Sequence, residues 1–199
     1  MKILLLGASG TIGRAVHALL APRHDLLTVG RSSGDLRADF TRPETLQAMF
    51  EAAGPVDAIV STAGGLHFGP LSEMTAEQFN SGLQDKLLGQ VRLALLGQRF
   101  LRDGGSITLT SGIIANEPIR HGANASAVNA AINGFVAGAA VDLARGLRIN
   151  AVSPTLLTES AQAYAAVFPG FETVPAARVA LAYQRSIEGA QTGRVYEVL

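Results

Sequence analysis

The sequence contains no cysteine, and charged residues make up only 16% of its 199 residues. The lack of cysteine excludes disulfide bonds, thiolate nucleophiles and thiolate-bound zinc. Its 16 basic and 16 acidic side chains cancel, so the chain has no general basic field that would attract nucleic acid or anionic lipid. No apolar run reaches the roughly 18 residues that a membrane-spanning helix needs. These absences predict a protein that has neither nucleic acid nor a membrane as its partner.

Hydrophobic residues, by contrast, make up 48% of the chain, which predicts a well-packed interior. The first apolar run, residues 1–6, breaks at Gly7 and is too short for a secretory signal, so we expect a cytoplasmic protein. The length suits one domain, and no linker, repeat or low-complexity tract divides it. We therefore expect a single domain over residues 1–199.

Short apolar runs alternate with longer helical patterns along the whole chain. The expected strands are residues 2–6, 26–29, 36–39, 56–61, 106–110, 149–152 and 194–198. The expected helices are residues 12–20, 43–53, 75–101, 123–145 and 175–188. Runs rich in Val, Ile and Leu with little alternation are typical of strands covered on both faces. The pattern predicts an α/β fold, a doubly wound Rossmann domain with a parallel sheet of about seven strands and helices on both faces.

The expected helix at 123–145 is apolar on all sides, and its first charged residue is Asp142. Such a helix lies on the sheet with one face and needs a second covering on the other. Its small residues would allow another helix to approach closely. We therefore expect a homodimer or higher homo-oligomer that forms through this helix and residues 75–101. The alternative is a long core helix under a loop.

A glycine-rich segment, residues 6–14, follows the first expected strand and opens the first expected helix. Gly7 would make the tight turn, Gly10 would let the backbone approach a pyrophosphate, and Gly13 would allow helix and strand to pack closely. The amide groups at the start of the helix would then face the anion. Strand, turn and helix in this order predict a dinucleotide site. The same segment contributes Ser9, Thr11, Ile12 and Arg14.

The residue that follows the second expected strand indicates which nicotinamide cofactor binds. An NAD site usually carries an acidic residue there, which holds the ribose 2′-hydroxyl. This chain has Arg31 instead, 18 residues after Gly13. Its guanidinium would pair with a 2′-phosphate, with Ser32 and Arg14 as further donors. Because charge-assisted hydrogen bonds contribute about 1.5–3 kcal/mol, the sequence predicts NADP(H) as cofactor, with NADH bound at least tenfold more weakly.

Over nearly its whole length the chain resembles the short-chain dehydrogenase/reductase family. The motifs that carry the resemblance are Gly-Ala-Ser-Gly-Thr-Ile-Gly at 7–13, Asp39-Phe40, Ala63-Gly64, Ser111 and Arg-Ile-Asn-Ala-Val-Ser-Pro at 148–154. The resemblance implies that Asp39 contacts the adenine and that Ala63 and Gly64 pass beside the ribose and nicotinamide. It also implies that residues 155–175 line the pocket of a small-molecule substrate. The residues thereby expected to contact the cofactor are Asp39, Phe40, Ala63, Gly64 and Pro154.

In this family the chemistry depends on a serine at the end of the fifth strand and a Tyr-x-x-x-Lys pair on the next helix. Ser111 matches the serine, but residues 129–135 align so that Ala125 stands at the tyrosine and Asn129 at the lysine. Lys86 stands where the family has an asparagine on the preceding helix. Asparagine and lysine are thus exchanged between the two helices. We expect Lys86 to deliver its ammonium to the same small volume, with Asn129 as its partner and Ser111 beside the substrate.

The acid that would replace the missing tyrosine stays open among His67, His121 and Tyr164, or none of them. No His, Asp and Glu residues cluster at the spacing of metal ligands, so we expect no metal. Three functions remain open for such a chain. The first is an NADP(H)-dependent oxidoreductase that transfers a hydride between nicotinamide and a small carbonyl or alcohol. The others are a non-catalytic NADP(H)-binding redox sensor or scaffold subunit, and an isomerase or dehydratase.

Overall fold

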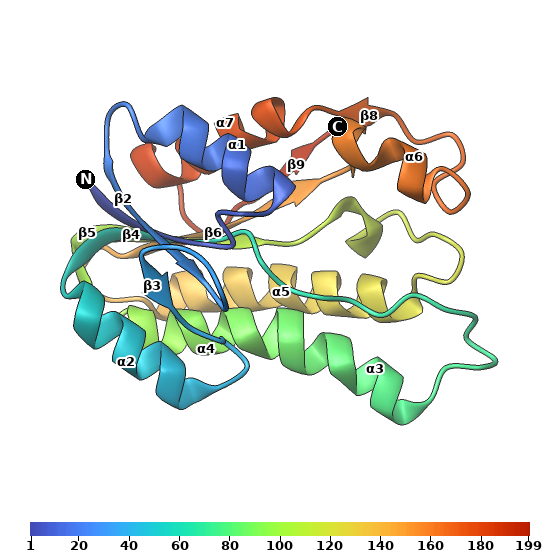
Figure 1. Cartoon of the computed structure of the whole chain (residues 1–199), viewed down its shortest axis with the longest axis horizontal. Helices are drawn as coiled ribbons and strands as arrows, with labels where there is room; N and C mark the ends of the chain where they lie inside the picture. The colour runs from blue at the N-terminus through green and yellow to red at the C-terminus, as the bar shows by residue number, and fades with distance from the viewer.

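The computed structural model describes residues 1–199, which fold around one seven-stranded sheet (Figure 1). The strand order is β3-β2-β1-β4-β5-β6-β9, and every neighbouring pair is parallel. The strands are β1 (Lys2–Leu6), β2 (Asp25–Gly30), β3 (Leu36–Arg37), β4 (Val56–Ser61), β5 (Leu101–Thr110), β6 (Arg148–Pro154) and β9 (Val195–Val198). Two further strands, β7 (Leu156–Leu157) and β8 (Thr173–Val174), pair with each other outside this sheet. The expected doubly wound Rossmann fold is confirmed.

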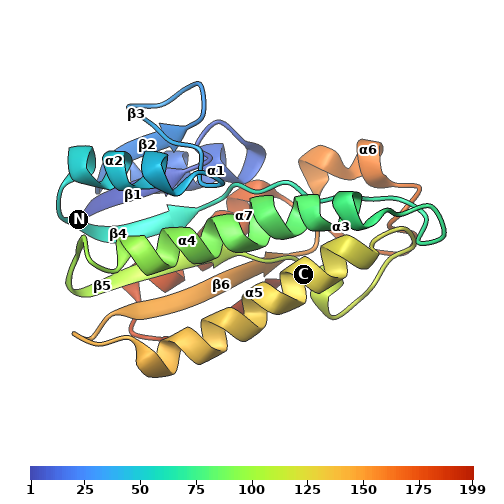
Figure 2. The ribbon, with the colours of Figure 1, turned by 90° about the horizontal axis from the view of Figure 1, so that it is seen from below.

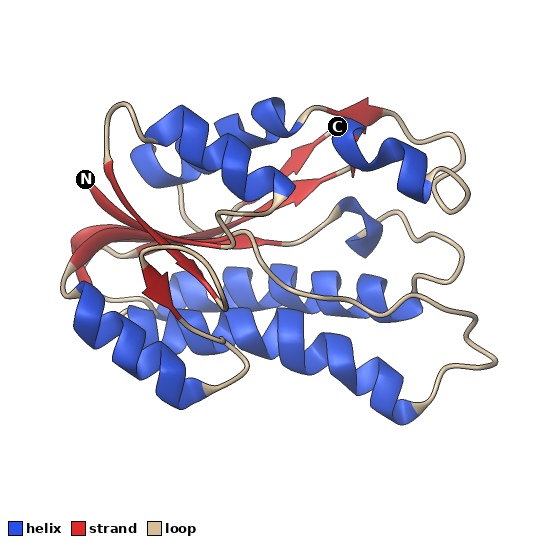
Figure 3. Cartoon of the chain, in the orientation of Figure 1, coloured by secondary structure: helices blue, strands red, loops and turns tan.

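Helices cover both faces of the sheet (Figure 3). They are α1 (Thr11–Leu20), α2 (Pro43–Ala53), α3 (Ala76–Gly82), α4 (Leu88–Gly97), α5 (Ala123–Asp142), α6 (Ala161–Tyr164) and α7 (Ala176–Glu188). Helices α2, α4 and α5 lie on one face, and α1 and α7 lie on the other (Figure 1). A π-helical turn, Leu83–Leu87, joins α3 to α4. Seen from below, α4 and α5 run side by side (Figure 2).

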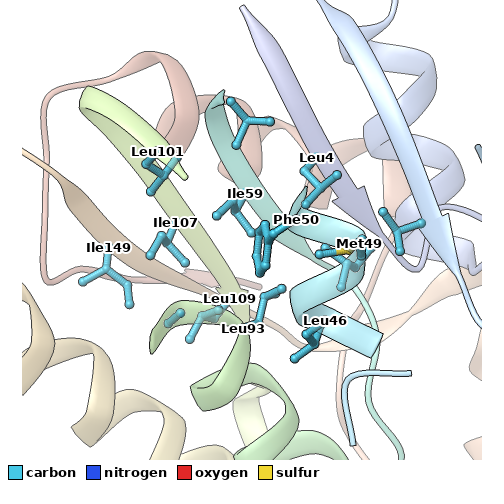
Figure 4. Close-up of a cluster of buried hydrophobic side chains, with 14 of the residues drawn as sticks. Leu4, Leu46, Met49, Phe50, Ile59, Leu93, Leu101, Ile107, Leu109 and Ile149 are labelled. Carbon is cyan, nitrogen blue, oxygen red and sulfur yellow. The ribbon is translucent and has the colours of Figure 1, made fainter. Parts of the chain in front are cut away.

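The larger apolar core fills the space between the sheet and helices α2, α4 and α5 (Figure 4). Within β1, Leu4 points into this core, whereas Ile3 and Leu5 point to the core under α1 and α7. Phe50 of α2 is fully buried and stacks on Phe100, with ring centroids 5.1 Å apart. Because both faces of β1 are covered, its residues 3–6 form a continuous apolar run.

Several of the expected boundaries are wrong. The expected helix at 75–101 is three consecutive pieces that end at Gly97, and β5 already begins at Leu101. The register between β4 and β5 shifts near the start of β5, where Gly104 has a positive φ of 75°, so alternation could not reveal this part of the strand. The expected strand at 36–39 is only the two residues of β3, because the N–H of Asp39 donates to the side-chain hydroxyl of Thr45 and not to a neighbouring strand.

Candidate active site

The carboxyl ends of the seven parallel strands meet at one edge of the sheet, and the candidate site lies there. The connections reverse direction between β1 and β4, and ligands of doubly wound sheets bind at such a reversal. Two adjoining cavities open at this point, with volumes of about 450 and 460 Å³. Both are lined by residues 62–65, the segment directly after β4. We call them the nucleotide cavity and the reaction cavity.

Most of the expected cofactor residues line these two cavities. The nucleotide cavity is lined by Gly7, Ser9, Gly10, Arg31, Ser32, Asp39, Phe40, Ala63 and Gly64. The reaction cavity is lined by Ile12 and Pro154, together with Ala63 and Gly64. Arg14 lines a smaller hollow of about 350 Å³, which shares Ser9 with the nucleotide cavity. Thr11 and Gly13 line none of them.

The glycines of the first loop are required by its close packing. Gly7 has a positive φ of 82°, and its carbonyl accepts the N–H of Gly10 at 3.0 Å. A Cβ on Gly13 would lie only 2.1 Å from the carbonyl oxygen of Gly7, so the helix can begin against this turn only without a side chain. Gly13 therefore packs helix against loop and does not face the cavity.

The start of α1 presents unpaired N–H groups, with their partial positive charge, to an anion. Its N-cap residue, Gly10, has no side chain to accept the first amide hydrogens, and the first turn holds no acidic residue. The first N–H groups of a helix have no partner within the helix, and the helix dipole is positive at this end. This arrangement fits the pyrophosphate of a dinucleotide.

The residue that follows β2 presents a guanidinium to the nucleotide cavity, and the carboxylates that come next in the sequence are already hydrogen-bonded. Arg31 is exposed and lines the cavity. Asp35 lies close by in sequence, but its carboxylate already accepts two hydrogen bonds from Thr28, one from the N–H at 2.9 Å and one from the side-chain hydroxyl at 2.7 Å. Asp39 is held by Thr41, whose hydroxyl bond is the main cause of a lowered Asp39 pKa, with the charge of Arg31 adding to it.

In the reaction cavity, the structure brings Lys86, Asn129 and Ser111 together. The ammonium of Lys86 donates to the side-chain oxygen of Asn129 at 2.7 Å and to the backbone carbonyl of Ser111 at 3.0 Å. The Ser111 hydroxyl donates to the backbone carbonyl of Asn129 at 3.1 Å. Lys86 belongs to the π-helical turn, which widens the helix where its side chain enters; such turns are frequent at functional sites.

Burial governs the protonation of Lys86. Lys86 is only 7% exposed, and no carboxylate contacts it. Its ammonium therefore loses water without gaining an opposite charge. This loss of solvation lowers the pKa of Lys86 from its ordinary 10.5 to about 8. Two neutral oxygen dipoles replace the water around it.

Sequence reasoning missed Gln90, which shapes the floor of the site. Direct pairing of β4 with β5 ends at Val60 and Thr108, so the backbone of Thr110 has no strand partner on that side. Gln90 is fully buried, donates to the carbonyl of Thr110 at 2.9 Å and accepts its N–H at 2.8 Å. The side chain thus replaces a strand where the sheet opens. A glutamine in a mostly apolar helix is the signal that could have indicated it.

Ala125, which the resemblance to the family places at the tyrosine, is fully buried within an apolar cluster. Its neighbours in this cluster are Ile113, Ile114, Leu66, Ile119, Phe168 and Phe171. His67 and His121 do not line the reaction cavity, whereas Tyr164 of α6 does and is 43% exposed. The two histidines lie in neighbouring loops, where the N–H of His67 binds Asn124 and the carbonyl of His121 binds Gly69. Of the three expected substitutes for the tyrosine, only Tyr164 reaches the cavity.

Comparison with known proteins identifies the family. The family model described as enoyl-(acyl carrier protein) reductase, a short-chain dehydrogenase/reductase model, matches residues 15–196. The chain belongs to the short-chain dehydrogenase/reductase family. A hydroxynaphthalene reductase-like protein of Metarhizium brunneum is 29% identical over 176 residues, which cover 76% of this chain and 66% of that protein. An uncharacterized oxidoreductase of Mycobacterium tuberculosis is 29% identical over 180 residues, covering 78% of this chain and 67% of the relative.

The chain spans about two thirds of the length of these curated relatives. Among solved structures, the similarity covers the full chain. A protein of Listeria innocua is 47% identical, with a TM-score of 0.98 and complete coverage of both chains. A small-chain dehydrogenase in complex with NADPH is 27% identical, with a TM-score of 0.87 and coverage of 100% of this chain and 96% of the other.

No helix combines the length and the apolar composition that crossing a membrane requires. No three His, Cys, Asp or Glu side chains gather in a group that could hold a metal ion.

The low pKa of Lys86 predicts a pH dependence of stability. Between about pH 7 and pH 9 the unfolded chain keeps the proton of Lys86 while the folded chain loses it, so the free energy of unfolding rises with pH. Relative to Lys86→Met, which lacks this titration, the wild type should gain about 1 kcal/mol over that range. Urea unfolding of both proteins at matched concentration measures the difference. A difference that stays constant with pH would contradict the lowered pKa.

Proposed function

We propose that the chain is an NADP(H)-dependent oxidoreductase that transfers a hydride between the nicotinamide and a small carbonyl or alcohol. The observation that carries the proposal is the continuity of the two cavities. The nucleotide cavity contains the glycine loop and Arg31, and it adjoins a reaction cavity that contains Lys86, Asn129 and Ser111. The reductase names of curated relatives and the NADPH complex of a structural neighbour support the same class of reaction.

Binding of the cofactor would use the polar residues of the nucleotide cavity. The start of α1 would hold the pyrophosphate, and Arg31 with Ser32 would hold a 2′-phosphate. Arg14 lines the adjoining hollow and is the second guanidinium available there, although one of its N–H groups already donates to the carbonyl of Ser9. Asp39 and Phe40, which line the same cavity, would face the adenine.

The reaction cavity would hold the nicotinamide and a substrate. The nicotinamide supplies or accepts the hydride when bound. Ser111 would turn its hydroxyl from the carbonyl of Asn129 to the substrate oxygen, and the Lys86–Asn129 pair would lie beside the ribose. The outer wall is aromatic: Tyr164 lies between Phe68 and Phe168, with ring centroids 6.5 and 6.4 Å away. Such a wall favours a small substrate with an apolar body.

One observation favours a second function, a non-catalytic NADP(H)-binding sensor or scaffold subunit. The site of the family's phenol is filled by Ala125 in a closed apolar cluster, so no tyrosine acid acts there. A sensor must bind the oxidised and reduced cofactors with different affinities, because a ligand shifts only the equilibrium whose states it distinguishes.

The first test is titration calorimetry with NADPH, NADP⁺ and NADH. We expect NADH to bind at least tenfold more weakly than NADPH, and Arg31→Gln to weaken NADPH binding by about tenfold or more, because one charge-assisted contact is lost. NADH binding should change little in this variant. Arg23→Gln is the matched control, because Arg23 follows the C-terminal end of α1 and pairs with Glu188. Equal losses for NADPH and NADH in Arg31→Gln would contradict the assignment of the 2′-phosphate site.

The second test separates the oxidoreductase from the sensor. NADPH consumption with a panel of small aldehydes, ketones and quinones should show turnover, with NADPH and NADP⁺ bound at similar strength. Absence of turnover, together with a large difference in affinity between NADPH and NADP⁺, would favour the sensor. If none of the cofactors binds, both functions are excluded.

We further propose that the chain forms a homodimer or higher homo-oligomer through α4 and α5. Their outer face is apolar, with Leu95 53% and Val141 86% exposed, and a groove of about 360 Å³ lies between the two helices. Gly134 and Gly138 of α5 leave open space on this side, where another helix could approach.

Light scattering should give at least the mass of a dimer for the wild type. Leu95→Glu should shift the population toward the monomer, because it places a charge in an apolar contact. Leu71→Glu is the matched control, since Leu71 is 72% exposed in the loop after β4, away from these helices. A monomeric wild type would refute this contact.

A further inference from the structure

Few side chains of the reaction cavity can exchange a proton. Among the residues that line it, only Lys86 and Tyr164 are ionisable. Tyr164 belongs to the short helix α6, and its ring lies against Phe68 and Phe168 in the outer aromatic wall. Lys86 enters from the opposite side and lies within hydrogen-bond distance of Ser111 and Asn129. Lys86 is therefore the ionisable group beside the serine that would hold the substrate oxygen.

The hydrogen bonds of Lys86 leave one proton free. An ammonium has three donors, and two are used by the Ser111 carbonyl and the Asn129 side chain. Both acceptors are neutral, and Lys86 forms no salt bridge within the chain. Because the residue also lines the reaction cavity, the third hydrogen is available to a ligand there.

The stem of Lys86 is fixed by close packing. Gly64, with a φ of 139°, lies directly over it, and a Cβ there would lie 2.6 Å from Cγ of Lys86. The side chain of Asn129 is packed closely in turn, because Asn129 is buried and a Cβ on Gly112 would lie 3.2 Å from its amide nitrogen. The ammonium therefore has a defined position, as proton transfer to a substrate requires.

We propose that Lys86 is the proton donor and acceptor of the reaction, in place of the phenol that Ala125 lacks; the proposal rests on the oxidoreductase function above. In the reducing direction, a hydride adds to the carbonyl carbon and the electron pair of the C=O π bond moves to oxygen. That oxygen takes a proton from Nζ of Lys86, so an N–H bond breaks, an O–H bond forms and a neutral amine remains. Solvent returns the proton to the amine. In the oxidising direction, the neutral amine would remove the hydroxyl proton while the hydride passes from the alcohol carbon to the oxidised nicotinamide.

The charges around Lys86 suit both directions. Asp85, its neighbour in sequence, accepts the N–H of Gly65 at 3.1 Å, and Arg92 of α4 binds Gln84. The only charged residue of α5 is Asp142, at the far end of the helix from Asn129. With no carboxylate to hold the proton, burial lowers the pKa of Lys86 to about 8, close to the neutral pH at which a general acid works best.

The chain contains only two lysines, Lys2 and Lys86, which allows a direct test. In Lys2→Arg, Lys86 is the only lysine, and isotope-labelled lysine gives one side-chain signal in an NMR titration. We expect a midpoint near pH 8 without ligand, and a change in this signal when NADPH is added. A midpoint at the ordinary lysine value would overturn the proposal, whether or not the enzyme turns over.

Kinetics then separate proton transfer from positioning. Lys86→Arg keeps a cation with hydrogen-bond donors but cannot release a proton at these pH values. With phenanthrenequinone as the probe carbonyl, we expect turnover to fall at least 100-fold in Lys86→Arg and Lys86→Met, while NADPH binding by calorimetry changes less than about tenfold. In the wild type, the reduction rate should fall as pH rises through about 8. Circular dichroism of each variant confirms that it folds.

The remaining outcomes distinguish a failure of the Lys86 role from a failure of the oxidoreductase function. Tyr164→Phe should lose far less turnover than Lys86→Arg, because its hydroxyl is not the donor. Loss of turnover in Tyr164→Phe with retention in Lys86→Arg would overturn the role of Lys86 and leave the oxidoreductase function intact. A wild type that binds NADPH but turns over no carbonyl would refute the oxidoreductase function, and the proton role with it.

Discussion

An ammonium group buried without a carboxylate beside it must be solvated by dipoles of the protein, and Lys86 is such a group. Burying a charge in this way costs free energy, so the surrounding structure has to supply oriented oxygen atoms. The side chain of Asn129 and the carbonyl of Ser111 supply them. This one requirement ties together α5, the end of β5 and the π-helical turn before α4.

The same requirement explains the exchange of asparagine and lysine between the two helices. A lysine on α5 would reach the site from the side of Asn129, whereas here it arrives from the π-helical turn on the other side. Asparagine can solvate an ammonium but cannot replace it, so the hydrogen bond between the two side chains can form in either orientation as long as one member is charged. Ala125 has no phenol and packs in an apolar cluster with Ile113 and Ile114.

Opening of the sheet makes room for this cluster of polar groups. Parallel strands must pair their backbones, and an unpaired buried N–H or C=O is costly. Gln90 satisfies both groups of Thr110 where β4 no longer reaches β5. On the far side, Thr110 donates its hydroxyl to the carbonyl of Ser61 and also contacts Tyr183, whose burial raises its pKa. The floor of the reaction cavity is therefore buried and hydrogen-bonded at Thr110, while its outer aromatic wall is more exposed.

Local patterns in the sequence determined the fold class, the order of strands and helices and the glycine loop, because each depends on residues close together in the chain. Apolar runs such as residues 2–6 specify strands, and the glycines at 7 and 13 stand where a side chain would not fit. The pairing of Lys86 with Asn129 was predictable only through the resemblance to a family, since 43 residues separate them.

Tertiary structure decided what depends on residues distant in sequence. Whether helix 75–101 stays continuous depends on how residues 83–87 and β5 pack, and its true end at Gly97 follows from the pairing of β5 with β4. The role of Gln90 depends on the point where two strands part. Which of His67, His121 and Tyr164 reaches the cavity is likewise set by the paths of three separate loops. The pKa of Lys86 depends on burial, which no local pattern specifies, because burial arises only when the whole chain has packed.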